Sequence, residues 1–453
     1  MTLAHFRFAP IAILATSSVW LLAAAPAAIP DPLSPLTDDD FPRNSAAEIE
    51  LGRDLFWDPI LSGNRNISCA TCHHPKFGTA DGLSLGMGEG GAGLGPDRHP
   101  VAENYPEQRM PRNSPALWNV GSRFFTALFA DGRIEVDPTR PSGFRTPMED
   151  EMITGFVSLL SAQTMFPVLS GDEMAGHYSE NEISERVRSG RITGEDGAWS
   201  AISARVEGIP TYLDRFRSIN PDIAAGRPIA FTDISNAIAA YVAFDFRSDG
   251  SPFDGYLRGE ATLPDEAMRG MTLFYGAAGC STCHSGPVLS DMQFHAMGDA
   301  QIGPGKTERF ETNARDMGRF RVSNRAADAY AFRTPSLRNV TLTAPYGHSG
   351  TFSDLGDYVR HHAQPGSALA DYDLSHAILP DLEVTKPDLA PDENGADFSA
   401  IKLAAEMAPR VDLTDEDLTA ILAFLATLED PTAKAGGRIG QPDGVPSGLP
   451  IDK

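Results

Sequence analysis

The segments ISCATCHHP (67–75) and GCSTCHSGP (279–287) contain all four cysteines of the chain. In each segment, two residues separate the cysteines and a histidine follows directly. Such pairs could form disulfides in an oxidising compartment, or two pairs together could bind one zinc ion. Neither alternative explains why His73 and His284 follow the cysteines at the same offset. The pattern CxxCH is the attachment sequence of a c-type haem, in which the histidine becomes the proximal iron ligand.

We therefore predict two covalently bound haem c groups, in which the thiols bond to the vinyl groups of the porphyrin. Each attachment site consists of two cysteines and one histidine: Cys69, Cys72 and His73 for the first haem, and Cys280, Cys283 and His284 for the second.

The first residues of the chain predict export. His5 and Arg7 precede a mostly apolar run from Ala9 to Leu22, and small residues follow. This is the pattern of a secretory signal peptide, here 1–29, which is removed from the mature protein. A membrane anchor is the alternative, but the run is short for a membrane span. We expect a periplasmic protein without stable membrane insertion.

Length and composition limit the class of protein. The 453 residues exceed what one hydrophobic core usually supports, so we expect two domains. The formal net charge of −24 argues against nucleic-acid binding. It would favour a basic partner or simply keep the protein soluble. Helical periodicity in 233–246 and 415–428 predicts a mainly α fold.

Two sequence blocks occur twice, once around each cysteine pair. The pattern E-x3-G-x2-L-F precedes the pairs at 48–56 and 266–274, and SPALWNV (114–120) and TPSLRNV (334–340) follow them. A duplicated unit is the simplest interpretation, with a helix whose Leu-Phe edge packs on the porphyrin. We predict two cytochrome-c-like (class I) haem domains in tandem, at 40–255 and 256–432, and a flexible tail at 433–453.

With RTPSLRNVTLTAPYGHSG (333–350) and SAQTMFPVLSGDEM (161–174), the two CxxCH units resemble the bacterial diheme cytochrome c peroxidases. They resemble equally the relatives of MauG, a diheme enzyme that uses peroxide to modify a protein. The likeness covers nearly the whole mature chain. It implies two cytochrome-c-like domains with a calcium ion between them, and peroxide as the oxidant. The family is also compatible with a homodimer.

A haem that carries electrons has both axial positions filled, whereas one that reacts with peroxide needs an open position. In the family, the distal ligand of the second haem follows the histidine of APYGHSG by 14 residues, which here is His362. Leu355, Val359 and His362 would share one face of a helix capped by Ser353, and His361 would point toward solvent. The alternative for His362 is a core histidine that bonds a backbone carbonyl.

For the first haem, the family often has a loop histidine as distal ligand, and Met87 falls nearest that position. Weak ligation by Met87 is one alternative. A five-coordinate or water-bound iron, ready for peroxide, is the one we expect. The glycines around Met87 predict a mobile loop.

Cleavage of the peroxide bond needs a group that moves a proton and a polar group that orients the peroxide. The resemblance assigns these catalytic roles to Glu173 as general acid/base and to Gln163 as a distal donor, with Pro167 as a wall of the pocket. Locally, Ser170 and Glu173 also match a capping box, so a purely structural role is the alternative.

The calcium site is implied by resemblance alone. Asn113 would supply a side-chain oxygen, and Thr343 and Pro345 would supply backbone carbonyls, which are suitable hard ligands.

The chain departs from the standard peroxidase pattern between the haems. Ala130 stands in LFADGR where the family usually carries tryptophan, and the insertion 136–155 follows. Trp118 would replace the missing aromatic or simply pack in the core. These departures resemble the MauG-like branch, which includes an enzyme that oxidises tryptophan in a copper-binding partner.

The resulting hypothesis is a periplasmic diheme peroxidase that reduces hydrogen peroxide with electrons from a small redox protein, either a cytochrome c or a cupredoxin. One alternative is peroxide-dependent oxidation of a side chain, such as tryptophan, in a partner protein. The other is an electron carrier without catalysis, which would have both haems closed.

Overall fold

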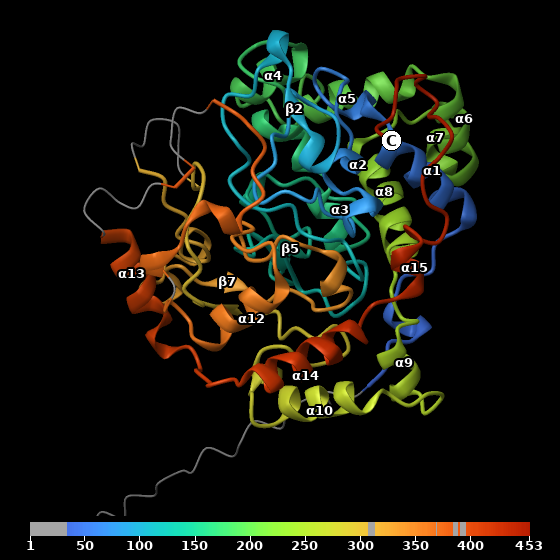
Figure 1. The fold of residues 1–453 in the computed structure, drawn as a ribbon. Helices are drawn as coiled ribbons and strands as arrows, with labels where there is room; N and C mark the ends of the chain where they lie inside the picture. Colours follow the sequence, from blue (N-terminus) through green and yellow to red (C-terminus); the bar gives the residue numbers. More distant parts are fainter. Residues whose placement is uncertain (1–33, 307–312, 368, 384–387, 390–395) are drawn as a thin grey trace, which may run out of the picture.

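A computed structural model describes residues 34–306, 313–367, 369–383, 388–389 and 396–453 (Figure 1). The predicted signal peptide, 1–29, lies outside the described residues. Within them the fold is largely helical with little sheet, so the mainly α prediction is confirmed. No described helix is long and apolar enough to cross a membrane.

The first repeated block forms a helix crossing. Helix α1 (Ala46–Trp57) begins with a capping box in which Ser45 and Glu48 bond each other's backbone N–H groups. It crosses α8 (Phe231–Asp245) at Gly52, where a Cβ atom would lie 1.8 Å from the carbonyl oxygen of Ala237. Glycine therefore sets how closely the two helices approach.

The second copy of this block forms the same crossing in the other half of the chain. Helix α10 (Asp265–Tyr275) crosses α14 (Asp415–Ala426), and a Cβ atom on Gly270 would lie 1.8 Å from the carbonyl oxygen of Ala420. Figure 1 shows α1 beside α8 on one side of the molecule and α10 beside α14 at its base. The sequence repeat is thus a repeat of structure.

The other repeated block, SPALWNV (114–120) and TPSLRNV (334–340), contributes an asparagine that bonds the segment after a long helix in each half. Asn119 and Asn339 both have left-handed backbone conformations, with φ of 61° and 60°. Asn119 donates to the carbonyl of Ser248 at 2.8 Å, beyond the end of α8. Asn339 accepts from the N–H of Asp430 at 2.8 Å, beyond the end of α14. Asparagine tolerates this backbone region better than most residues.

Short helices complete both halves. In the first half these are α2 (Cys69–Cys72), α3 (Leu159–Gln163), α4 (Glu182–Arg188), α5 (Ala198–Glu207), α6 (Pro210–Ile219) and α7 (Pro221–Ala224). In the second half they are α9 (Pro252–Leu257), α11 (Phe320–Ser323), α12 (Leu355–Ala363), α13 (Ala396–Ala404) and α15 (Pro431–Lys434).

The described strands are short and antiparallel. They form the pairs β1 (Gly91–Ala92) with β2 (His99–Pro100) and β6 (Phe294–His295) with β7 (Phe332–Arg333), and the sheet β3 (Ala127–Leu128), β4 (Ile134–Val136), β5 (Phe144–Arg145). The insertion at 136–155 thus contributes β5, which pairs with β4.

The hydrophobic cores divide the chain slightly earlier than the sequence indicated. The first core contains residues from Leu36 to Phe246, together with parts of later segments. Phe253, on α9, belongs instead to the second core and packs on Phe424 with ring centres 5.2 Å apart. The predicted boundary at 255/256 falls inside α9, whereas the two cores separate between α8 and α9.

Buried ion pairs join the two halves. Arg112 lies between Asp131 and Asp316, with closest nitrogen–oxygen distances of 2.7 and 2.6 Å. Burial alone would lower the pKa of Arg112, but the charges of Asp316 and Asp131 outweigh it and raise the pKa. Arg319 of the second half also pairs with Glu135 on β4 at 2.7 Å. These contacts hold one half against the other.

The segment 433–453, predicted to be a flexible tail, packs on the first half instead. Ser447 donates its hydroxyl to Asp58, a fully buried carboxylate, at 2.6 Å. Asp452 accepts from Thr71, inside the first cysteine pair. Figure 1 shows the C-terminus close to α2 and the end of α1. Glycine and proline gave this segment the composition of a loop, but its partners are nearly 400 residues away.

Two candidate haem-binding centres

The first centre is a single helical turn. Ser68 precedes α2, and the N–H of His73 bonds the carbonyl of Cys69 at 2.9 Å. Residues three apart on a helix lie on one side of it, so Cys69 and Cys72 are on the same side of the turn. The Nδ1 atom of His73 lies 3.1 Å from the carbonyl oxygen of Thr79.

The second centre repeats this arrangement with a tighter turn, η9 (Cys280–Thr282). The N–H of His284 bonds the carbonyl of Cys280 at 2.9 Å, and its Nδ1 lies 3.1 Å from the carbonyl oxygen of Leu289. Metal-ligating histidines commonly donate one ring N–H to a backbone carbonyl, which leaves the other nitrogen for the metal. Both histidines fit iron ligation in this respect.

The electrostatics of the two histidines fit ligation as well, since a metal binds the neutral imidazole. Burial lowers the pKa of His73. Burial and the neighbouring His362 lower the pKa of His284 to about 4. Both cysteines of the first centre are half-buried, and burial raises the pKa of Cys69 to about 12.

His362 lies on α12 and faces His284, with ring centres 6.2 Å apart. An iron atom about 2 Å from one nitrogen of each ring, with each ring centre roughly 1 Å farther on, would separate the centres by roughly 6 Å. The Nδ1 of His362 is buried and has no hydrogen-bond partner in the described part of the chain. The alternative, a core histidine, would need a bond to a backbone carbonyl, which this nitrogen does not make.

The neighbouring His361 does not point toward solvent, as predicted, but is only 5% exposed. Its Nε2 lies 3.1 Å from Asp299, a carboxylate that also accepts from Tyr358. The helix begins one residue later than expected, with Asp354 rather than Ser353 as its N-cap. Asp299 was not predicted to have a role, because nothing near it in the chain marks its contact with α12.

The predicted catalytic residues come from three consecutive short elements: Gln163 ends α3, Pro167 begins the turn η7 (Pro167–Leu169), and Glu173 lies in the π-helical turn η8 (Gly171–Ala175). Such π turns are frequent at functional sites. The Ser170 side chain makes no capping bond to a backbone N–H of the turn, but it does bond the carboxyl group of Glu173.

Glu173 lies near the first centre. Burial raises the pKa of Cys72 to about 12, and the charges of Asp81 and Glu173 add to this effect. Burial also raises the pKa of Glu173 itself, against the opposing charges of Lys306 and Arg133. A raised pKa keeps a carboxyl group protonated closer to neutral pH, which suits a general acid.

Two further residues, Met87 and Asp81, lie in the segment after the first cysteine pair, and the sequence indicated a role only for Met87. The side chain of Met87 is 1% exposed. Asp81 is buried as well, and burial raises its pKa to about 7. Sequence analysis missed Asp81, since a single aspartate in a loop carries no pattern.

The stretch around Ala130 contacts β7. The N–H of Arg333 bonds the carbonyl of Ala130 at 2.7 Å. The guanidinium carbon of Arg133 lies over the ring of Phe129, 3.4 Å from the ring centre. Trp118 is 2% exposed and donates to the carbonyl of Gly78 at 2.8 Å, as a core residue would.

The residues predicted to bind calcium lie on the two sides of the boundary between the halves. Asn113 donates its backbone N–H to the carbonyl of His348 at 2.9 Å, and its side-chain amide to Leu83 at 2.8 Å. Thr343 and Pro345 lie in the facing segment of the second half, where Thr343 approaches Gly78 of the first half.

The comparisons with known proteins agree with this geometry. The family description Di-haem cytochrome c peroxidase matches residues 46–262. Cytochrome c551 peroxidase of Pseudomonas aeruginosa is 32% identical over 342 residues, which are 74% of this chain and 77% of that protein. Methylamine utilization protein MauG of Methylorubrum extorquens is 28% identical over 343 residues, 75% and 73% of the two chains. A solved MauG-like protein associated with microbial copper homeostasis superposes with a TM-score of 0.58 at 25% identity, covering 90% of this chain and 96% of that one.

Proposed function

This chain belongs to the di-haem cytochrome c peroxidase family, and we propose that its two centres have different tasks. The chain is an oxidoreductase that uses peroxide and carries two haem c groups. We assign the reaction with hydrogen peroxide to the first centre, at Cys69, Cys72 and His73. We assign electron transfer to the second, at Cys280, Cys283 and His284.

The asymmetry between the centres carries this proposal. At the second centre, His362 stands opposite His284 at the separation that two ligands of one iron require. At the first, no described histidine ring is paired with His73 in this way. Two filled axial positions suit an electron carrier, and one open position suits an oxidant.

A bound haem c supplies an iron that exchanges electrons and, with one position open, reacts with peroxide. The chain supplies the proton chemistry. The carboxyl group of Glu173 would accept the proton of the inner peroxide oxygen and return it to the outer one, so that the outer oxygen leaves as water. The amide of Gln163 would donate to the peroxide and orient it, and Pro167 would keep further water from the pocket.

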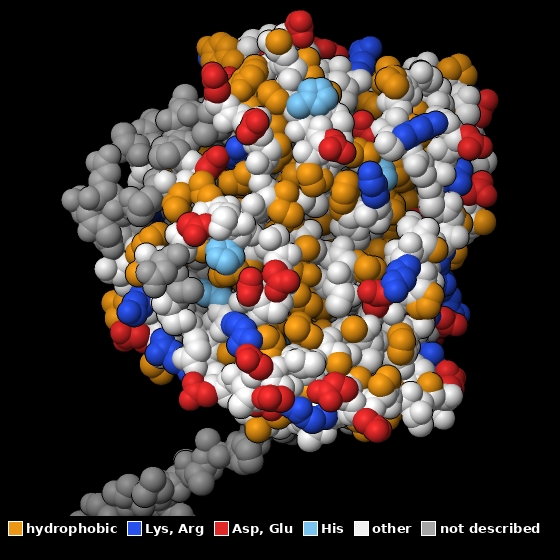
Figure 2. Space-filling view, in the orientation of Figure 1, with side chains coloured by type: hydrophobic (Ala, Val, Ile, Leu, Met, Phe, Trp, Pro, Cys, Tyr) orange, Lys and Arg blue, Asp and Glu red, His pale blue; other side chains and the backbone are white. Residues whose placement is uncertain are grey.

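The source of electrons separates two versions of this function. In the first, a small redox protein, a cytochrome c or a cupredoxin, supplies them. The net charge of −24 supports a basic partner, although Figure 2 shows acidic side chains spread over the visible face among basic ones rather than gathered in one patch. In the second, a side chain of a partner protein, such as tryptophan, is oxidised.

The second version is favoured by Ala130, which stands where family peroxidases usually carry tryptophan, and by the similarity to the solved MauG-like protein. The experiment is to mix the purified protein with peroxide, with and without reduced cytochrome c. Rapid oxidation of the cytochrome supports the first version. A long-lived oxidised species that ignores the cytochrome supports the second. Two low-spin haems at every redox level would overturn both in favour of a pure electron carrier.

Export to the periplasm and a calcium ion at Asn113, Thr343 and Pro345 complete the proposal. The signal-peptide pattern supports the location. Two contacts between the halves support such a site: Asn113 bonds His348 of the second half, and Thr343 lies against Gly78 of the first. Calcium takes side-chain and backbone carbonyl oxygens. A chelator should lower both the activity and the thermal midpoint of unfolding, and unchanged values for both would remove this site.

A further inference from the structure

A second cluster of oxygen ligands lies in the loop that follows the first attachment site. Its centre is Glu89, whose side chain is fully buried. One carboxylate oxygen of Glu89 accepts from the side-chain amides of Asn64, Asn66 and Asn104, at 2.8, 2.8 and 2.7 Å. The asparagines come from two separate segments of the chain, before and after Glu89.

The charge of this cluster is not balanced. The other carboxylate oxygen of Glu89, Oε2, is buried and has no hydrogen-bond partner, and neither has Oδ1 of Asn104, in the described residues. No lysine, arginine or histidine of the described segments forms an ion pair with Glu89. A buried, unpaired carboxylate is costly, so a cation is the group that the cluster lacks.

The chemistry of the side chains indicates which cation. A half-turn of an asparagine amide exchanges its nitrogen for its oxygen, and the two atoms occupy nearly the same positions. The amides of Asn66 and Asn104 turned in this way, with the two oxygens of Glu89, would offer four oxygen ligands. Asn64, whose oxygen accepts from Asn181 at 2.9 Å, would stay beside the ion as a donor to Glu89. Calcium takes about six to eight, with water as the remainder. We propose that Glu89, Asn66 and Asn104 form a second site for calcium, separate from Asn113.

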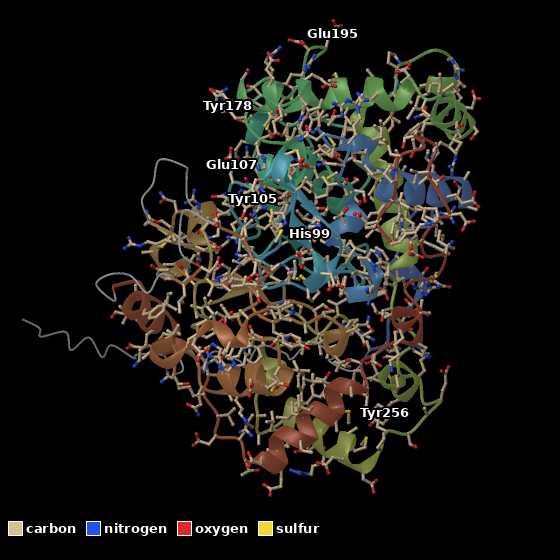
Figure 3. The ribbon with its side chains drawn as sticks, turned by 45° about the horizontal axis from the view of Figure 1, so that its top comes forward. His99, Tyr105, Glu107, Tyr178, Glu195 and Tyr256 are labelled. Atoms are coloured by element: carbon tan, nitrogen blue, oxygen red, sulfur yellow. The ribbon has the colours of Figure 1, made fainter. Side chains whose placement is uncertain are left out.

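The surroundings of the cluster are compatible with entry of an ion. Asn66 is exposed, and Asn64 also contacts the carboxylate of Glu180 at 2.7 Å, which adds negative charge beside the site. Figure 3 shows Tyr105, which follows Asn104, at the same side of the molecule as Tyr178. Because Asn66 is exposed, the site would lie near the surface.

The position of the cluster suggests what the ion does. The N–H of Glu89 donates to the carbonyl of Asp172 at 2.8 Å. A Cβ atom on Gly88 would lie 2.0 Å from the same carbonyl oxygen, so the two segments are in close contact. The turn at Asp172 carries Glu173. An ion at Glu89 would hold this turn in place, a consequence that rests on the role proposed for Glu173.

Calcium binding itself is tested without any measure of activity. The full-length holoprotein is depleted with a chelator and titrated with calcium chloride, and bound calcium is counted by elemental analysis and calorimetry. We expect two ions per chain, one lost in Glu89→Gln and the other in Asn113→Ala. Asn66→Ala should weaken the first by about tenfold. Glu103→Gln, the same change one residue from Asn104 at an exposed position, should bind as the wild type does.

The outcomes separate this inference from the proposed function. One ion that Glu89→Gln removes would support the Glu89 site and count against the one at Asn113. Equal calcium content in wild type and Glu89→Gln would overturn the inference, whatever the peroxidase activity. If Glu89→Gln does not fold, as judged by its haem spectrum, Asn66→Ala decides, and an unchanged affinity in this exposed variant would overturn the inference equally.

Discussion

The ring centres of His284 and His362 lie 6.2 Å apart with the ring planes tilted by 46°, although His284 follows the turn η9 and His362 lies on the distant helix α12. His284 is buried and His362 is half-buried, and in both burial lowers the pKa, which favours the neutral imidazole that binds a metal. This relationship distinguishes the second centre from the first.

Removal of the second of these histidines should open the second iron. We expect His362→Ala to convert one low-spin haem to high spin, visible in the ferric absorption spectrum, without loss of covalent haem. His361→Ala is the matched control, because His361 is adjacent on the same helix but bonds Asp299. Its spectrum should remain that of the wild type. If His362→Ala keeps the wild-type spectrum, another residue is the ligand.

Removal of the proposed proton-transfer group should slow the reaction at the first centre. Glu173→Gln keeps the size of the side chain but cannot accept and return a proton. We expect the rate of peroxide consumption to fall by about 100-fold or more, with haem content intact. Glu151→Gln, an exposed position in the same half, is the control. An unchanged rate in Glu173→Gln would leave the residue with a structural role only.

The sequence predicted the features that local rules determine. The CxxCH turns are such a feature, because covalent attachment requires both cysteines and the histidine within one turn. The helix repeat is another, since Gly52 and Gly270 mark the same close crossing in each half. The assignment of Glu173 and His362 came from resemblance to a family and stays a prediction, which the short distance between the rings of His284 and His362 favours.

The features that escaped prediction depend on partners far away in the chain. His361 was expected in solvent because helix periodicity cannot show that Asp299, from a distant segment, contacts that face of the helix. The tail was expected to be flexible because composition cannot show that Ser447 reaches Asp58. The boundary predicted at 255/256 falls inside α9, because sequence alone cannot show that Phe253 packs in the second core.

Burial of Asp81 should make stability depend on pH. Burial raises its pKa to about 7, from about 4 in an unfolded chain. The folded protein therefore holds this proton more tightly, and the resulting stability is fully present below about pH 4 and is lost as the pH rises through about 7. Asp81→Asn should remove this dependence, which amounts to about 4 kcal/mol at most. Denaturant unfolding of both proteins from pH 5 to 8 measures it, and parallel curves would contradict it.

Contact of the tail with the first half should contribute to stability. Asp58 is fully buried and accepts from Tyr212 at 2.7 Å as well as from Ser447. Ser447→Ala removes one donor from a buried carboxylate, which should cost about 1–3 kcal/mol in the free energy of unfolding. Asp443→Ala, an exposed change in the same segment, should cost little. Equal stability of both variants would show that the tail is held elsewhere.

The two helix crossings offer a test of the repeat itself. A methyl group on Gly270 would meet the backbone carbonyl of Ala420, which cannot turn away as a side chain could. Gly270→Ala should therefore push α10 from α14 and destabilise the second half by about 3 kcal/mol or more. Gly52→Ala should do the same to the first half through Ala237, since the distances are equal.

A matched change separates this steric effect from the intrinsic effect of alanine. Gly444→Ala meets no atom within 4 Å and should be close to neutral. Because alanine is the better helix former, a Gly→Ala change inside α10 would stabilise the protein if the crossing were loose. Denaturant titration of both variants measures the change in the free energy of unfolding, and its sign decides whether the shared spacing of E-x3-G-x2-L-F in the two blocks reflects packing. Stabilisation by Gly270→Ala would contradict this explanation.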